Sequence, residues 1–252
     1  MNEKKKILIT GASGFIGGFL VDAALHRGYE VWAGTRKQSV RDNFMDKPVH
    51  LIDLFYDDKD ELARQIHETV EISGKWDYII HNAGITKTLH KQDFYKVNSS
   101  YTSNLIEALA EAGCKPQKFV LMSSLSCFGP VKENSTEPIT ADDEPKPNTE
   151  YGKSKLAAEN FLKQQRYFPY IILRPTGVYG PRDKDYLVEL KSINQGFDFK
   201  PGMKPQMLTF IYVKDLAKAV FLAIENENIN NKAYFVADGD VYSDDEFSKT
   251  VQ

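Results

Sequence analysis

The stretch Thr10-Gly11-Ala12-Ser13-Gly14-Phe15-Ile16-Gly17 follows directly on the apolar run Ile7-Leu8-Ile9 near the N-terminus. That β-branched run predicts a short buried strand. Apolar residues then recur at helical spacing over residues 15–27, and Gly28 stands where a C-terminal helix glycine is expected. A second strand is predicted over residues 29–34. The glycines therefore occupy the turn of a strand–helix–strand unit.

Glycines in that turn are typical of a dinucleotide-binding loop. Gly11 permits a tight turn, Gly14 lets a pyrophosphate approach the backbone, and Gly17 lets the helix pack closely on the strand. The phosphates are expected at the helix N-terminus, where free N–H groups favour anions. The spacing is G-x-x-G-x-x-G and not G-x-G-x-x-G, and a glycine-rich turn without a ligand is the alternative.

The residues after the second strand bear on the choice of cofactor. An acidic side chain there would bind the ribose 2′-hydroxyl of NAD, whereas a basic one accommodates the 2′-phosphate of NADP. The chain has Arg36 and Lys37 at this point, and no acid before Asp42. We therefore predict NADP(H), with NAD(H) as the alternative if the two basic side chains are merely solvated.

Length and composition favour one large domain, or one domain with a small lobe. The 252 residues carry 32 basic and 35 acidic side chains, a net charge of −3, and no long basic block. This gives no support to nucleic-acid or membrane-surface binding. Cys114 and Cys127 have no metal-binding or redox spacing. We expect no metal and no membrane segment, and a cytoplasmic location.

Strands and helices are predicted to alternate along the rest of the chain, and residues 132–150 are predicted to form a long loop. This alternation indicates an α/β fold with a Rossmann-type, doubly wound parallel sheet, which binds ligands outside the carboxyl ends of its strands. The predicted strands are 49–52, 76–81, 118–122 and 170–174, and the predicted helices are 60–73, 100–112 and one that carries Tyr151.

Tyr151 and Lys155 are four residues apart, so on a helix they share one face, whereas Lys153 points elsewhere. A lysine beside a tyrosine favours the phenolate and lowers the phenol's pKa, which suits proton transfer to or from an alcohol or ketone. The spacing is weak evidence by itself, because a solvated helix face produces it as readily.

Together these motifs resemble the extended short-chain dehydrogenase/reductase family, and in particular its NAD-dependent epimerase/dehydratase branch. The resemblance runs from about Lys5 to Gly239. It implies that Ser124, Tyr151 and Lys155 are catalytic and that Ser124, Ser126, Thr176 and Gly177 contact the substrate. The cofactor-binding residues it implies, together with those argued above, are Gly11, Ser13, Gly14, Phe15, Ile16, Gly17, Arg36, Lys37, Asp53, Leu54, Asn82, Ala83, Gly84, Asn98, Tyr151, Lys155, Pro175 and Val178.

Two features depart from the family pattern. Thr176-Gly177 replaces an asparagine that many nucleotide-sugar members carry, and Ser243-Asp244-Asp245-Glu246 resembles a capping box for a helix that has barely two turns before Gln252. We therefore expect a Rossmann domain over residues 1–180 and a partial, truncated or minimal substrate-binding lobe over residues 181–252. This lobe interleaves with the last Rossmann elements.

The leading hypothesis is a nucleotide-sugar epimerase or dehydratase that transfers hydride at a carbinol carbon. The alternative is an NADPH-dependent aldehyde or ketone reductase, which the basic pair and the missing asparagine favour. A non-catalytic NADP-binding sensor is less compatible with an intact Ser124, Tyr151 and Lys155 set. The partner is thus a small molecule, a nucleotide sugar or a carbonyl compound. The resemblance also implies a homodimer paired through helix 100–112 and the Tyr151 helix.

Overall fold

The computed structural model describes residues 4–36, 39, 41, 44, 46–130, 137–195 and 207–251. Its centre is a seven-stranded sheet in the order β10-β6-β5-β4-β1-β2-β3, in which all neighbouring strands are parallel. The strands are β1 (Lys6–Thr10), β2 (Glu30–Thr35), β3 (Val49–Asp53), β4 (Tyr78–His81), β5 (Lys118–Met122), β6 (Tyr170–Pro175) and β10 (Lys232–Val236). The predicted doubly wound sheet is confirmed, and its strand order reverses between β1 and β4.

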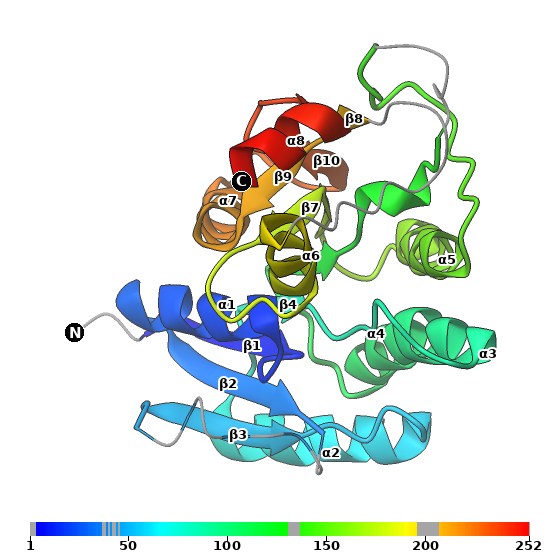
Figure 1. Cartoon of the computed structure of the whole chain (residues 1–252). Coiled ribbons are helices and arrows are strands. Elements are labelled where there is room, and N and C mark those ends of the chain that lie inside the picture. The colour runs from blue at the N-terminus through cyan, green and yellow to red at the C-terminus, as the bar shows by residue number, and fades with distance from the viewer. Residues whose placement is uncertain are drawn as a thin grey trace.

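Helices cover both faces of this sheet (Figure 1). One face is covered by α1 (Phe15–His26) and α7 (Val213–Glu225), and the other by α2 (Lys59–Ser73), α4 (Tyr101–Glu111) and α5 (Glu150–Gln164). Within β1, Ile7 and Ile9 belong to the first core and Leu8 to the second. Because both faces are buried, the strand is apolar at consecutive positions and does not alternate with polar residues.

The predicted helix over 100–112 corresponds to α4 (Tyr101–Glu111), and the helical turns that precede it are not predicted by the sequence. Helix α4 starts at Tyr101 and follows α3 (Lys91–Phe94) and a π-helical turn, Tyr95–Ser100. In this turn the amide of Asn98 bonds both backbone groups of Ile85, at 2.9 and 3.0 Å. The irregular turn therefore places a buried side chain under the loop that follows β4, which no periodicity in the sequence indicates.

A small lobe lies above the carboxyl ends of the central strands (Figure 1). Its inner part is built around Phe210, whose ring packs on those of Tyr179, Tyr186, Tyr242 and Phe247. The lobe contains β7 (Gly177–Tyr179) paired with β9 (Phe210–Tyr212), β8 (Met207–Leu208) paired with β11 (Tyr242–Ser243), α6 (Asp185–Asn194) and α8 (Asp244–Val251).

Residues after 180 do not all belong to this lobe, because α7 packs on α1 and β10 joins the central sheet beside β6. The capping box before α8 is confirmed. The Ser243 hydroxyl accepts the Glu246 N–H at 3.2 Å, and the Glu246 carboxylate accepts the Ser243 N–H at 2.9 Å.

The long loop before α5 is confirmed over residues 137–149, which contain no helix or strand; the beginning of the predicted loop, up to residue 136, lies outside the described residues. Glu150 is the first residue of α5, not the last of the loop. The Thr149 side chain caps this helix by accepting the Gly152 N–H at 3.0 Å.

A buried carboxylate connects α5 to two central strands. Glu159 is fully buried and accepts two hydrogen bonds from Arg174 of β6, at 2.9 and 2.6 Å, and one from the Ser123 hydroxyl at 2.6 Å. Burial alone would raise the pKa of Glu159. The hydrogen bonds from Arg174 and Ser123 outweigh this effect, so its pKa lies below its ordinary value and the pair is ionised near neutrality.

We predict that Glu159→Ala lowers the free energy of unfolding by about 3–5 kcal/mol, because the change leaves the Arg174 guanidinium buried without its counter-charge. Urea unfolding followed by circular dichroism measures the loss. The matched control is Arg64→Ala, whose ion pairs with Glu61 and Glu68 are exposed; it should leave the unfolding midpoint unchanged. Equal midpoints for the two variants would contradict the role given to Glu159.

Candidate functional site

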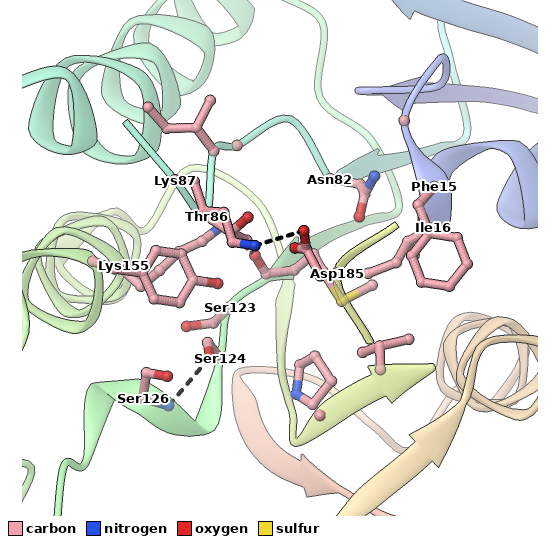
Figure 2. A pocket seen from close by; sticks show the side chains of 18 of the residues that line it. Phe15, Ile16, Asn82, Thr86, Lys87, Ser123, Ser124, Ser126, Lys155 and Asp185 are labelled. Carbon is pink, nitrogen blue, oxygen red and sulfur yellow. Dashed lines mark hydrogen bonds and ion pairs between the residues drawn. The ribbon is translucent and has the colours of Figure 1, made fainter. Parts of the chain in front are cut away.

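A cleft of about 1870 Å³ opens along the carboxyl ends of β1, β4, β5 and β6, under the small lobe. Figure 2 shows Phe15, Ile16 and Asn82 on one side of it, and Ser124 and Lys155 on the other. The predicted site residues that line it are Gly11, Ser13, Gly14, Phe15, Ile16, Arg36, Asn82, Ala83, Gly84, Ser124, Ser126, Tyr151, Lys155, Pro175, Thr176, Gly177 and Val178. Gly11 and Val178, which are 167 positions apart in the chain, therefore share one space.

The glycine loop has the shape that the sequence predicts. Gly11 adopts a φ of +63°, and a Cβ there would lie 2.8 Å from the backbone of Ala83. A Cβ on Gly17 would overlap the carbonyl oxygen of Gly11. Both positions therefore require glycine. Gly11 requires it for its backbone conformation, and both require it because other backbone atoms pack closely against them. Gly17 itself does not line the cleft, in keeping with a packing role.

The N-terminus of α1 faces the cleft and fits an anion. Gly14 is its N-cap, no side chain within the described residues caps it, and its first turn carries no acid. A Cβ on Gly14 would be 3.2 Å from the Gly11 carbonyl, so a side chain there would crowd the loop. Free N–H groups beside an open backbone are suited to hold a pyrophosphate.

His81 fixes this loop against the end of β4. Its Nε2 lies 2.9 Å from the Thr102 hydroxyl, which donates to the Asn98 carbonyl, so Nε2 carries the proton. Nδ1 then accepts from the Thr10 hydroxyl at 2.9 Å, and Thr10 accepts the backbone N–H groups of residues 82 and 83. Burial lowers the pKa of His81 to about 3, so it is a neutral, packed histidine.

Besides Gly17, three predicted cofactor residues lie outside the cleft lining for identifiable reasons. The Asp53 carboxylate accepts from the Thr35 hydroxyl at 3.1 Å and from Arg41, while Leu54 is buried against Gly34. Asn98 is buried beneath the loop after β4 and donates to the Ser154 hydroxyl at 3.1 Å. These residues support the lining and do not form it. Lys37 lies outside the described residues.

Ser124 and Tyr151 come together because α5 approaches the turn after β5 very closely. A Cβ on Gly152 would overlap the Ser126 carbonyl oxygen. Ser124 begins a 3₁₀ turn and its hydroxyl accepts the Ser126 N–H at 3.1 Å. Lys155 lies one turn after Tyr151, and its ammonium donates to the Met122 carbonyl at 3.0 Å. Lys153 is exposed and pairs with Glu150 at 2.9 Å, as predicted.

The electrostatics of this pair correct one expectation. Burial raises the pKa of Tyr151 to about 12, against a smaller lowering by a hydrogen bond from Ser124. Burial also lowers the pKa of Lys155 to about 8. The expected lowering of the Tyr151 pKa by Lys155 is therefore not found in the polypeptide by itself. The lysine is held by a carbonyl oxygen, and removal of the phenol from water is the larger effect.

Several residues that line the cleft were not predicted from the sequence. Tyr56 lines the cleft and stacks on Tyr101 with ring centroids 5.1 Å apart. On the lobe side, the Lys87 ammonium and the Asp185 carboxylate join across the cleft at 2.7 Å (Figure 2). The other missed residues include Ser39, Thr86, Asn148, Thr149, Tyr186, Leu187, Met207, Leu208, Thr209 and Phe210. They come from loops and lobe elements without a motif, so nothing local in the sequence marks them.

The described residues give no support to a metal centre or to a cysteine nucleophile. No three of their His, Cys, Asp or Glu side chains gather where they could hold a metal ion. The described helices include none that is long and apolar enough to cross a membrane. Cys127 is buried, and burial raises the pKa of its thiol to about 11, which makes it a poor nucleophile.

Comparison with known proteins identifies the family of this chain. The model of the NAD dependent epimerase/dehydratase family matches residues 7–237. A Candida albicans protein named as an NADPH-dependent methylglyoxal reductase is 25% identical, over 94% of this chain and 80% of that one. The human sterol-4-alpha-carboxylate 3-dehydrogenase, decarboxylating, is 27% identical over 93% of this chain, which spans only 62% of that protein.

Among solved structures, the UDP-glucose 4-epimerase of Thermus thermophilus, solved in complex with NAD, superposes with a TM-score of 0.79. It is 25% identical, over 98% of this chain and 82% of that one. The sequence motifs, the parallel sheet with its glycine loop, and the family match over most of the chain lead to one conclusion. The chain belongs to the NAD dependent epimerase/dehydratase family.

Proposed function

We propose that this enzyme transfers hydride between a nicotinamide cofactor and a carbinol or carbonyl carbon of a small molecule, with Tyr151 moving the hydroxyl proton. The observation that carries the proposal is the convergence of Ser124, Tyr151 and Lys155 on one cleft whose other half is a dinucleotide-type glycine loop. A pure binding protein would need only the loop. The assembled polar set therefore supports an enzyme over an NADP sensor.

The residues present fit a dinucleotide. The α1 N-terminus and the backbone at Gly11–Gly14 would hold the pyrophosphate, and Ala83 and Gly84 would border the middle of the cofactor. Lys155 would donate to the ribose next to the nicotinamide. When bound, the reduced cofactor supplies hydride to a carbonyl carbon and the oxidised cofactor accepts it from a carbinol carbon.

Tyr151 would act on the substrate oxygen, and Ser124 would donate a hydrogen bond to the same atom to fix its position. In reduction, the hydride adds to the carbonyl carbon and the oxygen takes the phenol proton, which yields an alcohol and a phenolate that later recovers a proton from solvent. A phenol with a pKa of about 12 is protonated near neutrality, so it is ready to donate. Oxidation of the substrate needs Tyr151 as the phenolate. Lowering the pKa of Tyr151 from about 12 to neutrality requires about 7 kcal/mol of stabilisation of the phenolate.

Two kinds of reaction use this chemistry. A reductase stops after one hydride delivery, in which Tyr151 gives up its proton once. A nucleotide-sugar epimerase or dehydratase oxidises its substrate transiently and then returns the hydride. The family match and the likeness to a UDP-glucose 4-epimerase support this second candidate.

NADP(H) is the cofactor we propose. Arg36 lines the cleft at the end of β2, and Ser39 accepts the Arg36 N–H at 3.1 Å, so a guanidinium and a hydroxyl border the place expected for the adenosine ribose. The nearby acid, Asp53, is bonded to Thr35 and Arg41. A 2′-phosphate would therefore meet a cation there and no uncompensated carboxylate.

We predict that Tyr151→Phe reduces hydride transfer by roughly 10²–10⁴-fold, because it removes the proton donor without removing bulk. The assay is the disappearance of reduced cofactor with any aldehyde or ketone that the wild-type enzyme turns over. Binding of the cofactor, followed by fluorescence titration, should change less than about twofold, well under 1 kcal/mol.

The control for this variant is Tyr95→Phe, which deletes the same hydroxyl from an exposed tyrosine bonded to Glu150 at 2.8 Å. It should leave hydride transfer unchanged. Turnover by Tyr151→Phe at the rate of the control would remove Tyr151 from the chemistry.

We predict that Arg36→Ala weakens NADPH binding about tenfold and leaves NADH binding unchanged, because only NADPH carries the phosphate that the guanidinium would contact. Parallel fluorescence titrations with the two cofactors measure this. Wild-type protein that binds NADH at least tenfold more tightly than NADPH would rule out the proposed preference.

A further inference from the structure

We infer that the lobe side of the cleft takes an uncharged, ring-bearing ketone or carbinol, and not a substrate carried on a diphosphate. This rests on the hydride transfer proposed above and names the substrate class for that site. The lobe side consists of the described lining residues of α6, β8 and β9 together with the turn at Gly177. Three properties of these residues carry the inference: their aromatic packing, their exposed apolar side chains and their charges.

The turn at Gly177 is closed by aromatic rings. A Cβ on Gly177 would overlap the Tyr186 hydroxyl oxygen and lie 2.9 Å from the Phe210 ring. The rings of Tyr186 and Phe210 pack edge to face with centroids 5.5 Å apart. No larger side chain fits at residue 177 while Tyr186 stays in place. The turn therefore presents to a substrate the surface of an aromatic ring and the edge of a phenol.

The ring surface is held in position from behind. Phe210 also stacks on Phe247 of α8, with centroids 5.1 Å apart, and contacts Tyr242 of β11 at 6.0 Å. Its side chain is buried, although it borders the cleft. A wall fixed by several elements of the lobe is preorganised, so a flat apolar ligand meets it without ordering it first.

Apolar side chains continue this wall at the surface of the cleft. Leu187 of α6 and Met207 of β8 line the cleft but remain 45% and 52% exposed. Leu208 and Ile139 also line it. Apolar groups that stand exposed in a cleft gain free energy when an apolar ligand covers them. A diphosphate would lose its hydrating water there, and the apolar side chains would not compensate for the lost hydration.

The charges on the lobe side also disfavour a diphosphate. The N-terminus of α6 borders the cleft, but the Asp183 carboxylate accepts the N–H groups of Asp185 and Tyr186 at 2.9 and 3.1 Å. The anion site that a free helix end would offer is thus filled by the chain itself. Three cations among the described residues line the cleft at or next to this side. Lys87 is paired with Asp185 at 2.7 Å, Arg182 is paired with Asp22 at 3.5 Å, and Lys184 lies between Asp183 and Asp185 in the sequence.

The test compares two probes on the protein saturated with NADP⁺: α-tetralone, an uncharged bicyclic ketone, and UDP-glucose. Saturation-transfer NMR gives the concentration of each probe at half-saturation. We expect α-tetralone to half-saturate at a concentration about tenfold below that of UDP-glucose, because the wall rewards apolar area. Tighter binding of UDP-glucose, or no saturable binding of α-tetralone, would overturn the inference.

A matched pair of variants locates the binding. Leu187→Ser should raise the half-saturation concentration of α-tetralone about fivefold, because it removes apolar area from the wall. Val188→Ser, on the neighbouring residue, should not change it, since Val188 is 69% exposed and lies outside the cleft lining. Equal effects of the two variants would also overturn the inference.

The same samples separate this inference from the proposed function. If NADP⁺ binds and UDP-glucose is oxidised or epimerised, hydride transfer stands and only the substrate class is wrong. If neither NADP(H) nor NAD(H) binds, the proposed function itself fails.

Discussion

The buried carboxylate of Glu159 is the interaction on which the rest of the site depends. It lies two helical turns after Tyr151 on α5, and it holds both Arg174 of β6 and Ser123 at the end of β5. The residue after Ser123 is Ser124, so this carboxylate sets the distance between the helix that carries the phenol and the turn that carries the serine. The Arg174 guanidinium also packs on the ring of Phe128, 4.8 Å from its centroid, which closes the far side of the same turn.

The cleft that results has two halves with different physical properties. One half is mainly backbone: glycines and a helix N-terminus, which suit phosphates and a nucleotide and which the buried, neutral His81 holds in place. The other half is side chain: a fixed ring wall, exposed apolar groups and a helix end capped by its own Asp183. Tyr151 and Ser124 lie between the two halves, where hydride and proton would be exchanged. The first half follows from the fold, whereas the second half depends on the side chains that this chain has in its small lobe.

Local sequence predicted the first half well. Glycines directly after an apolar strand and before a periodic helix have few other uses, and the i, i+4 spacing of Tyr151 and Lys155 fixes their common helix face. The convergence of Ser124 with this pair follows from the carboxyl ends of parallel strands lying at one edge of the sheet. These features depend on short-range geometry and on one topological rule, so a single sequence contains them.

The rest depends on contacts between distant residues. Asp53 is bonded to Arg41 and does not reach the cleft, the pKa of Tyr151 rises because of burial, and Tyr186 fills the space beside Gly177. None of these three features is marked by a spacing or a motif in the sequence. The π-helical turn at Asn98 likewise takes part in a contact between separate segments, the two hydrogen bonds of Asn98 with Ile85. The predicted pairing of two copies through α4 and α5 and the predicted boundary at residue 180 stay predictions.

The central claim is that this cleft holds a nicotinamide dinucleotide against Tyr151. Its most direct test is to denature the purified protein and identify the released nucleotide by mass spectrometry, both as isolated and after incubation with NADP(H) and NAD(H). We expect close to one equivalent of nicotinamide dinucleotide per chain after incubation, with NADP(H) retained in preference to NAD(H). Protein that releases neither dinucleotide under any of these conditions would contradict it.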